Sequence, residues 1–324
     1  MAVQAAVYDS VKCQPPRPIS VAEVAAALRE PDQVVWVDIA GVHAEAEVLM
    51  REVFNFHPLA IEDTRNQRQR PKVEEYVGYL FTILNSVALE GEDVEFTELD
   101  VFAGDNFIVT VHMAAEPCID EARRRVDNVC NIKPITTGYL LYILLDVVVD
   151  SYFPLLDEIG DEIEDIGDAI FEAPRQQSVQ RLFRLKRTLN EMWRVANQQR
   201  DMFMLLMREN NALVRDEQLR FYMRDVYDHL LRISDHITTF RETLNNVVDL
   251  YMSAVSNRLN QQVNRLTIIT MGIGVLAVVS GFYGMNFEHT WPPFSAPWGV
   301  PFVLVIMLLT LVVIFGLIYF RKQR

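Results

Sequence analysis

Residues 266–287 read LTIITMGIGVLAVVSGFYGMNF, and residues 300–320 read VPFVLVIMLLTLVVIFGLIYF. Neither run contains an Asp, Glu, Lys, Arg or His residue. As a helix that rises about 1.5 Å per residue, each run is roughly 30 Å long, which is the thickness of the hydrocarbon core of a bilayer. The sequence therefore predicts two transmembrane helices, over about 266–283 and 300–320, joined by a short loop.

The charges beside the two runs predict their orientation. Basic residues precede the first run and follow the second, whereas the loop between them holds one charged residue, Glu288; the basic residues are Arg258, Arg265, Arg321, Lys322 and Arg324. Because positively charged flanks remain in the cytoplasm, both termini are expected there and the loop outside. Residues 1–14 lack the basic start and the apolar core of a signal peptide, so residues 1 to about 257 are also expected in the cytoplasm.

The composition excludes several classes of protein. The net charge of −14 argues against a nucleic-acid partner, because a phosphate backbone would be repelled. No G-x-x-x-x-G-K-[ST], GxSxG or HExxH motif occurs, so neither ATP-driven transport nor an enzyme is indicated. The cysteines Cys13, Cys118 and Cys130 lack CxxC spacing, which favours reduced thiols in a cytosolic domain.

Residues 1–150 predict a cytoplasmic α/β domain. Segments 34–39 and 79–89 are rich in strand-forming residues, and segment 44–54 can form a helix. Two further strands, 99–102 and 107–112, flank the turn sequence Ala-Gly-Asp-Asn and predict a hairpin. The sequence therefore divides into this domain, a helical region over 151–257 and a membrane domain over 258–324.

The helical region is unusual because residues 175–271 contain no Gly or Pro. A polar break at 209–211 predicts two antiparallel helices, of which the second begins near Asp216 and continues to Tyr283 without a stop signal, over about 100 Å. Apolar residues recur along the second helix at steps of three and four: Val226, Leu230, Ile233, Ile237, Phe240, Leu244, Val247 and Tyr251. This seam is expected to pack against other helices of the chain or against copies of itself.

The second helix carries two histidines, a residue type that often binds metal ions. His229 and His236 lie two turns apart, about 10 Å, which is too far to share one metal ion without other ligands. Both are therefore expected to be surface residues.

The loop sequence Gly284-Met285-Asn286 ends the first transmembrane run. Gly284 permits tight backbone geometry, and Asn286 offers a neutral carbonyl oxygen on the outer side. Neutral oxygens suit Mg²⁺, which sheds its water reluctantly and can be held through its hydration shell. Taken alone, the same Asn would also serve as a helix cap in an ordinary membrane hairpin.

Five segments decide between these two interpretations. They are SNRLN (256–260), LTII (266–269), GFYGMNFE (281–288), HPLAIED (57–63) and QRPKVE (69–74). Together with the second apolar run and the basic tail they closely resemble the CorA family of magnesium and cobalt transporters. The resemblance implies a homopentamer with a funnel-shaped cytoplasmic head in the cell (inner) membrane, with Gly284, Met285 and Asn286 of each subunit in a selectivity ring.

The resemblance also implies that the first transmembrane helix lines the pore. Residues at steps of three and four along it are small or polar, apart from one valine: Asn260, Val263, Thr267, Thr270, Gly274, Ala277 and Gly281. Such a face fits a pore lining, and it also fits close packing of helices through small residues. Leu266 matches a hydrophobic constriction of the family, whereas Gly274 replaces the bulky Met of some relatives, so a second constriction is not expected.

A regulatory cation site follows from the resemblance as well. Asp249 matches a position that faces an acidic residue of the neighbouring head, here Glu90, Glu92 or Asp93. Mg²⁺ that bridges such carboxylates would lock the subunits and close the pore, so intracellular Mg²⁺ is expected to be both transported and regulatory. Solvated carboxylates with no ligand role are the alternative.

The loop after Asn286 leaves the choice of ion open. Glu288 is expected at the outer mouth, where one carboxylate per subunit would concentrate cations. The sequence that follows, His289–Pro293, departs from the family pattern. The function that the sequence favours is a Mg²⁺ channel driven by the membrane potential, with Co²⁺ or Ni²⁺ as further ions; a zinc transporter and a non-conducting membrane-anchored sensor are the alternatives.

Overall fold

The computed structural model describes residues 3–67, 69–91, 93–113, 116–172, 176–208, 217–285, 291–293 and 296–322. The chain divides into two compact units, Met1–Val248 and Asp249–Arg324. The strands are β1 (Val3–Asp9), β2 (Arg17–Ile19), β3 (Gln33–Ala40), β4 (Lys72–Tyr76), β5 (Tyr79–Glu90), β6 (Asp93–Gly104) and β7 (Phe107–His112). The helices are α1 (Val21–Ala27), α2 (Ala44–Val48), the π-helix η1 (Leu49–Val53), α3 (Pro58–Arg65), α4 (Pro117–Val129), α5 (Thr137–Asp150), α6 (Tyr152–Glu172), α7 (Gln176–Arg208), α8 (Glu217–Tyr283) and α9 (Gly299–Lys322).

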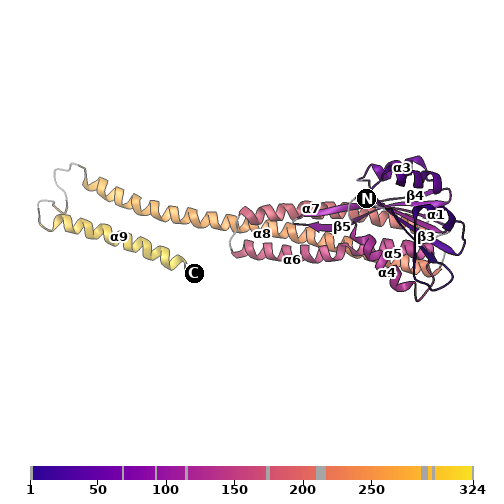
Figure 1. Cartoon of the computed structure of the whole chain (residues 1–324). Helices are drawn as coiled ribbons and strands as arrows, with labels where there is room; N and C mark the ends of the chain where they lie inside the picture. The colour runs from indigo at the N-terminus through magenta and orange to yellow at the C-terminus, as the bar shows by residue number, and fades with distance from the viewer. Residues whose placement is uncertain are drawn as a thin grey trace. The chain divides into compact units, whose positions relative to one another are not determined.

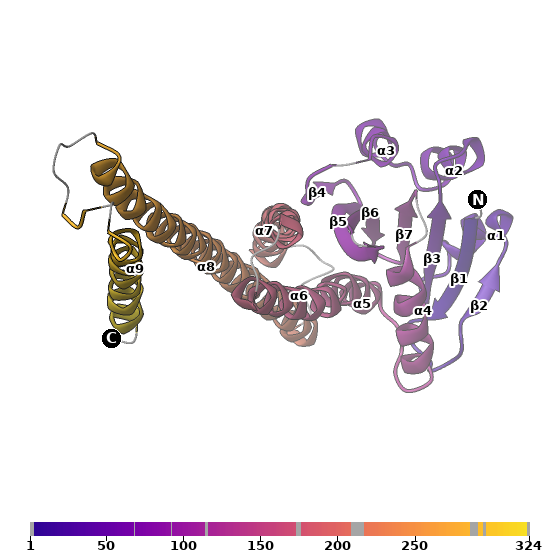
Figure 2. The same ribbon diagram turned by 90° about the vertical axis from the view of Figure 1, so that its left-hand side faces the viewer.

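The first unit contains a seven-stranded sheet in the order β2-β1-β3-β7-β6-β5-β4. The pair β3 and β7 is parallel, and the other neighbouring strands are antiparallel. Figure 2 shows the strands with α1, α2 and α3 near one side of the sheet and α4 near the other. The predicted α/β fold is confirmed, and strands β3 and β5 lie where the sequence predicts them.

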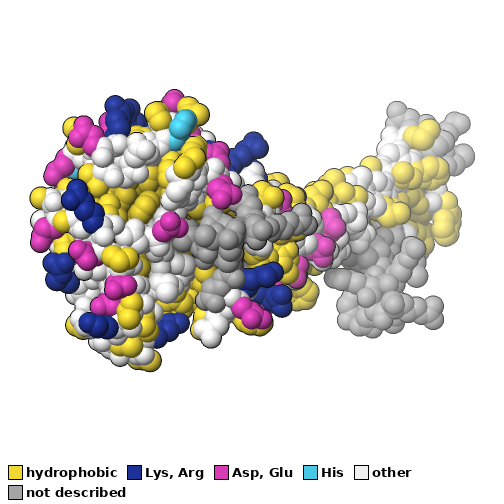
Figure 3. Space-filling view, turned by 90° about the vertical axis from the view of Figure 1, so that its right-hand side faces the viewer, with side chains coloured by type: hydrophobic (Ala, Val, Ile, Leu, Met, Phe, Trp, Pro, Cys, Tyr) yellow, Lys and Arg dark blue, Asp and Glu magenta, His cyan; other side chains and the backbone are white. Residues whose placement is uncertain are grey.

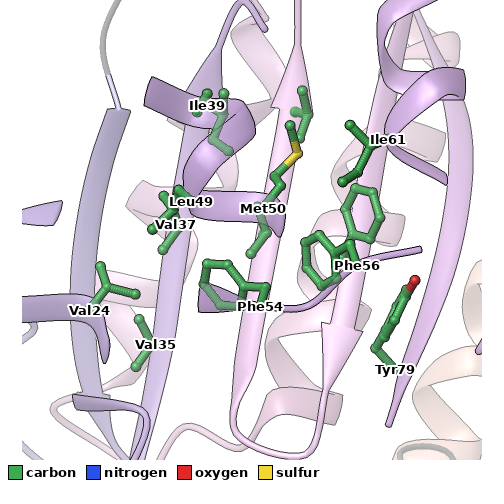
Figure 4. Close-up of a cluster of buried hydrophobic side chains, with 14 of the residues drawn as sticks. Val24, Val35, Val37, Ile39, Leu49, Met50, Phe54, Phe56, Ile61 and Tyr79 are labelled. Atoms are coloured by element: carbon green, nitrogen blue, oxygen red, sulfur yellow. The ribbon is translucent and has the colours of Figure 1, made fainter. Parts of the chain in front are cut away.

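One face of the sheet packs against α1, α2, η1 and α3. Val35, Val37 and Ile39 alternate along β3, so all three point to this face and join one buried cluster with residues of the covering helices. Figure 4 shows these side chains facing Val24, Leu49, Met50 and Ile61. The segment predicted to be helical, 44–54, forms α2 and η1 and is therefore part of the layer that covers this face of the sheet.

Phe54 and Phe56 attach the end of this helical layer to the sheet. Phe56 stacks on Phe102 with ring centroids 4.1 Å apart and also contacts Tyr79 at 4.8 Å. Asn55, between Phe54 and Phe56, has a positive φ of 54°, a conformation that Asn tolerates better than most residues. This turn allows both rings to enter the core, as Figure 4 shows.

The predicted hairpin at residues 99–112 is confirmed. Strands β6 and β7 pair with Ala103 opposite Ile108, around a connection at Asp105 and Asn106. Glycine is required at position 104, because a Cβ atom there would lie 2.2 Å from the Phe107 ring. The opposite face of the sheet packs on α4, where the Arg123 guanidinium lies 5.4 Å from the Trp36 ring.

The long helices of the first unit pack against one another, as the predicted seam requires. Six seam residues are at most 8% exposed: Val226, Leu230, Ile233, Ile237, Leu244 and Val247. A seventh, Phe240, is half-buried, and its ring passes over Gly160 of α6, where a Cβ atom would lie 3.2 Å away. Figures 1 and 2 show α6 beside this part of α8, so the seam packs within its own chain. The predicted break at 209–211 lies outside the described residues.

The surface of the first unit carries both signs of charge. Figure 3 shows Lys and Arg side chains interspersed with Asp and Glu on the face turned to the viewer. Helix α6 contributes the exposed acidic residues Asp157, Glu158, Asp161, Glu164, Asp165, Asp168 and Glu172. Its apolar face is buried, because Ile159, Ile163 and Ile170 are each at most 4% exposed. An amphipathic helix of this kind buries only one stripe.

A carboxyl group without a partner lies inside the first unit. Asp100 on β6 is fully buried, and neither of its oxygens has a hydrogen-bond partner among the described residues. Burial raises the pKa of Asp100 well above its usual range, and the nearby carboxylates of Glu98 and Asp63 raise it further against the opposing charge of Lys72. The folded chain therefore holds this proton more tightly than the unfolded chain does.

We expect Asp100→Asn to change the pH dependence of stability. The stabilisation from protonated Asp100 is complete below the unfolded pKa of about 3.9 and is lost as pH rises through the folded pKa, by up to about 1.4 kcal/mol per pH unit. An asparagine does not titrate, so the variant gains stability over the wild type as pH rises. Urea unfolding of both chains across pH 5 to 9 measures this gain. The exposed turn residue Asp105 provides the control, Asp105→Asn; parallel curves for Asp100→Asn and the wild type would contradict the expectation.

Candidate ion-conducting site

The second unit contains the two helices that the sequence predicts to span a membrane. The most apolar 18-residue window of α8 is not enclosed by the rest of the chain, and the first part of α9, Gly299–Thr310, is likewise apolar. The segment Thr137–Glu172 is also long and apolar enough to span a membrane, but 67% of its window lies inside the first unit. That segment therefore belongs to the core of the first unit, whereas α8 and α9 remain the candidate transmembrane helices.

Helix α9 packs on one side of α8. Gly272 is buried, and Val275 lies in a shallow apolar pocket with Ile306, Leu309, Thr310 and Val313 of α9. Val279, one turn further along the same side, is half-buried. These residues mark the side of α8 that faces α9.

The predicted pore residues occupy the other side of α8. All eight are exposed in the single chain: Asn260, Val263, Leu266, Thr267, Thr270, Gly274, Ala277 and Gly281. At about 100° of rotation per residue, Thr270, Gly274 and Gly281 lie roughly 160° to 200° from Gly272. The face that the sequence assigns to a pore is therefore turned away from α9 and is open to another partner.

The hydroxyl groups on this face are oriented by the helix itself. The Thr267 hydroxyl donates a hydrogen bond of 2.9 Å to the carbonyl oxygen of Val263, and the Thr270 hydroxyl donates one of 2.9 Å to that of Leu266. Because each proton is used within the helix, the remaining lone pairs of the oxygen atom are available as acceptors. Oxygen acceptors on an exposed face suit the water shell of a cation.

The glycines of α8 differ in the space around them. A Cβ atom at Gly274 or Gly281 would meet nothing within 4 Å, so these glycines leave open space on the exposed face. A Cβ atom at Gly284 would lie 3.1 Å from the carbonyl oxygen of Ser280. The Gly284 amide donates to that same oxygen at 2.9 Å. Gly284 thus forms a tight turn directly after Tyr283, the last residue of α8.

The remaining loop residues of the prediction, Asn286 and Glu288, lie outside the described residues. Beyond them the chain returns to α8, because the Tyr283 hydroxyl donates to the carbonyl oxygen of Trp291 at 3.4 Å. The Trp291 and Phe302 rings meet edge to face at 5.7 Å. This aromatic group was not predicted from the sequence, although aromatic residues next to an apolar run are typical of the membrane interface.

The acidic residues proposed for the regulatory site occur in two places. Asp249 is exposed on α8. Glu90 and Asp93 pair in the backbone of the β5–β6 hairpin, whose turn contains Gly91 with a φ of 68°. Glu92 and the side chains of Glu90 and Asp93 lie outside the described part of the chain. The hairpin therefore places the backbones of Glu90 and Asp93, two of the three candidate partners of Asp249, opposite each other.

A second cluster of possible ligands was not predicted. His229, expected at the surface, is only 22% exposed, and its Nδ1 atom lies 3.3 Å from Oδ1 of Asp150. Asp146 is buried nearby, and Arg125 holds both carboxylates, at 2.7 Å from Asp146 and 2.9 Å from Asp150. Burial raises the pKa of Asp146 to about 6, with Asp150 acting in the same direction and Arg125 against it. His236, in contrast, is exposed as predicted.

Comparison with known proteins identifies the family. A family model described as CorA-like Mg²⁺ transporter protein matches residues 31–322, which is most of the chain. The chain belongs to the CorA-like Mg²⁺ transporter family. The resemblance inferred from the Gly-Met-Asn loop and four other segments is thereby confirmed. Because members of the CorA family are transport proteins of membranes, the expectation that the chain is not an enzyme is confirmed as well.

Individual relatives agree with this assignment. The cobalt/magnesium transport protein CorA of Thermotoga maritima is 34% identical over 301 residues, which cover 91% of this chain and 84% of that protein. The complete structure of the CorA magnesium transporter from Methanocaldococcus jannaschii superposes with a TM-score of 0.82 over 98% of both chains, at 21% identity. At that identity the superposition shows a common fold, and it confirms the predicted α/β head, long helix and C-terminal helices.

Proposed function

We propose that this CorA-family chain is a Mg²⁺ channel of the cell (inner) membrane, which also admits Co²⁺ and Ni²⁺. One observation carries the proposal: the exposed face of α8, with its hydroxyl groups and glycines, leads directly into Gly284 and Met285 at the end of the helix. The relative from Thermotoga maritima bears the name of a cobalt/magnesium transport protein, which supports the same choice of ions.

The membrane potential is sufficient to drive the proposed uptake. A doubly charged ion gains about 4.6 kcal/mol for each 100 mV that it crosses, so no ATP is required. The orientation predicted from the basic flanks places the head and both termini in the cytoplasm, towards which a negative interior draws cations. The whole chain carries a net charge of −14, which attracts cations and repels nucleic acid.

Selection would rest on neutral oxygens and not on a tightly binding carboxylate. The carbonyl oxygen of Asn286 and the hydroxyls of Thr267 and Thr270 can accept hydrogen bonds from the water molecules of hydrated Mg²⁺. Such contacts are weak enough for the ion to leave. Glu288 would raise the local cation concentration at the outer mouth without acting as a trap.

A pore needs more than one copy of the chain. One helix with a small and polar face cannot enclose an aqueous path, so the open face of α8 is expected to meet copies of itself around an axis. We propose a homopentamer, the assembly that the family resemblance implies, in which α8 lines the pore and α9 faces lipid. The proposed division of each subunit is a domain over 1–150, a helical region over 151–257 and a membrane domain over 258–324.

Ion flux in proteoliposomes tests the proposed function. The purified full-length chain is reconstituted, a potential negative on the side of the head is imposed, and Mg²⁺ entry is followed with a fluorescent indicator. We expect entry that increases with the potential, and competition by Co²⁺ and Ni²⁺. The absence of any flux would favour a non-conducting sensor, and preferential Zn²⁺ flux coupled to protons would favour a zinc transporter.

Regulation by intracellular Mg²⁺ gives a separate expectation for Asp249. If Mg²⁺ bridges Asp249 to the hairpin tip of a neighbouring subunit, Asp249→Ala removes a ligand and weakens that lock. We expect about a tenfold higher Mg²⁺ concentration for half-maximal protection of the head against protease, which corresponds to roughly 1.4 kcal/mol.

The control for this measurement is Asp235→Ala, since Asp235 is also an exposed carboxylate on α8. It should give the protection curve of the wild type. Identical curves for Asp249→Ala and the wild type would remove Asp249 from the regulatory site and leave the proposed conduction untouched.

A further inference from the structure

We infer that Asp146, Asp150 and His229 form a binding site for a transition-metal ion of the Co²⁺ class in the first unit. One ligand atom from each residue lies within 4.8 Å of the other two. Asp146 and Asp150 are four residues apart on α5, so their side chains share one face of that helix. His229 reaches the same place from α8. A metal ion here would connect α5 of the α/β domain with the long helix.

The histidine ring is positioned to act as a ligand. Its Nδ1 atom is buried and has no hydrogen-bond partner in the described part of the chain, although Oδ1 of Asp150 lies 3.3 Å away. The Phe153 ring packs edge to face on the imidazole at 5.5 Å and restricts its orientation. A buried polar nitrogen without a partner is costly, and coordination of a metal ion would satisfy it.

The carboxylates of Asp146 and Asp150 are held in place by Arg125. Arg125 donates to Oδ2 of Asp146 at 2.7 Å and to Oδ2 of Asp150 at 2.9 Å. The guanidinium thereby fixes both carboxylates, and Oδ1 of Asp150 faces His229. Ligand carboxylates in metal sites are commonly held by such an outer hydrogen-bond donor. The positive charge of Arg125 weakens the attraction of a cation to this cluster, and the negative charge of Asp225 on α8 strengthens it.

The ligand set selects the class of ion. Imidazole nitrogen with two carboxylate oxygens suits Co²⁺, Ni²⁺ and Zn²⁺. Mg²⁺ prefers oxygen ligands and keeps several of its water molecules, so a site built around His229 discriminates against it. The head would thus respond to transition-metal ions separately from Mg²⁺. The site requires the folded head and does not depend on conduction through α8.

Co²⁺ binding to the full-length chain in detergent tests the site. Co²⁺ is added in the presence of millimolar Mg²⁺, and both its visible absorption and the thermal unfolding of the protein are recorded. We expect His229→Gln to lower the affinity for the stabilising Co²⁺ ion by at least about tenfold. Glutamine retains most of the side-chain volume but is a poor ligand. His229→Ala should act in the same direction.

The matched control is His236→Ala, because His236 is an exposed histidine two turns along the same helix. This variant should bind Co²⁺ as the wild type does. Asp150 is left unchanged because its loss would also remove a partner of Arg125. Equal Co²⁺ spectra and equal thermal stabilisation in His229→Gln and the wild type would overturn the proposal and leave the cluster as an ion-pair network with Arg125.

Discussion

Asn286→Ala is expected to lower Mg²⁺ flux at least about 100-fold while the protein still folds and assembles. In the proposed ring each subunit contributes one side-chain amide oxygen, so the substitution removes all of these side-chain acceptors at once. A 100-fold loss corresponds to about 2.7 kcal/mol in the barrier for ion entry. Alanine keeps the backbone, and the tight turn made by Gly284 should be unchanged.

Flux in proteoliposomes at a fixed potential measures the effect, with size-exclusion chromatography as the check of assembly. Asn264→Ala is the matched control, because Asn264 is an exposed asparagine of α8 that lies outside the proposed pore face. It should conduct as the wild type does. Flux at the wild-type rate in Asn286→Ala would refute the selectivity role of the loop, and loss of assembly would indicate a structural role instead.

Local sequence patterns predicted the architecture of this chain well. The helix α8 was predicted from about Asp216 to Tyr283 and extends from Glu217 to Tyr283, because its sequence contains no proline and has no glycine before Gly272. The seam at Val226, Ile233 and Ile237 is buried because its spacing matches the helical period. Periodicity and the lack of glycine and proline are properties of neighbouring residues, so they can be recognised without knowledge of the fold.

Contacts between distant residues could not be predicted in this way. Asp150 and His229 meet although 79 positions separate them, and only the packing of α5 against α8 brings them together. The burial of Asp100 depends on its place on an interior strand of the sheet, which the sequence of that strand alone does not reveal. The sequence likewise could not show whether the seam packs within its own chain or against a second copy. The structure shows packing within the chain, because Gly160 of α6 lies beside the Phe240 ring of the seam.

Gly274→Leu is expected to block conduction, with at least about a 100-fold loss of Mg²⁺ flux. Gly274 is exposed on the side of α8 away from α9, and a Cβ atom there would meet nothing within 4 Å of the same chain. The substitution therefore fits the folded subunit, and leucine favours the helix over glycine by about 1 kcal/mol. Around the axis of an oligomer, however, each copy would place a branched apolar side chain in the water path, and hydrated ions do not cross such a constriction easily.

Gly316→Leu separates this effect from the general consequence of a larger residue in the membrane. Gly316 is a glycine of α9, and a Cβ atom at that position also meets nothing within 4 Å. The two variants thus add the same side chain to open space on different helices. If α8 lines the pore and α9 supports it, Gly274→Leu loses flux and Gly316→Leu conducts as the wild type does. The reverse result would place the ion path along α9, and normal flux in both variants would mean that neither glycine faces the path.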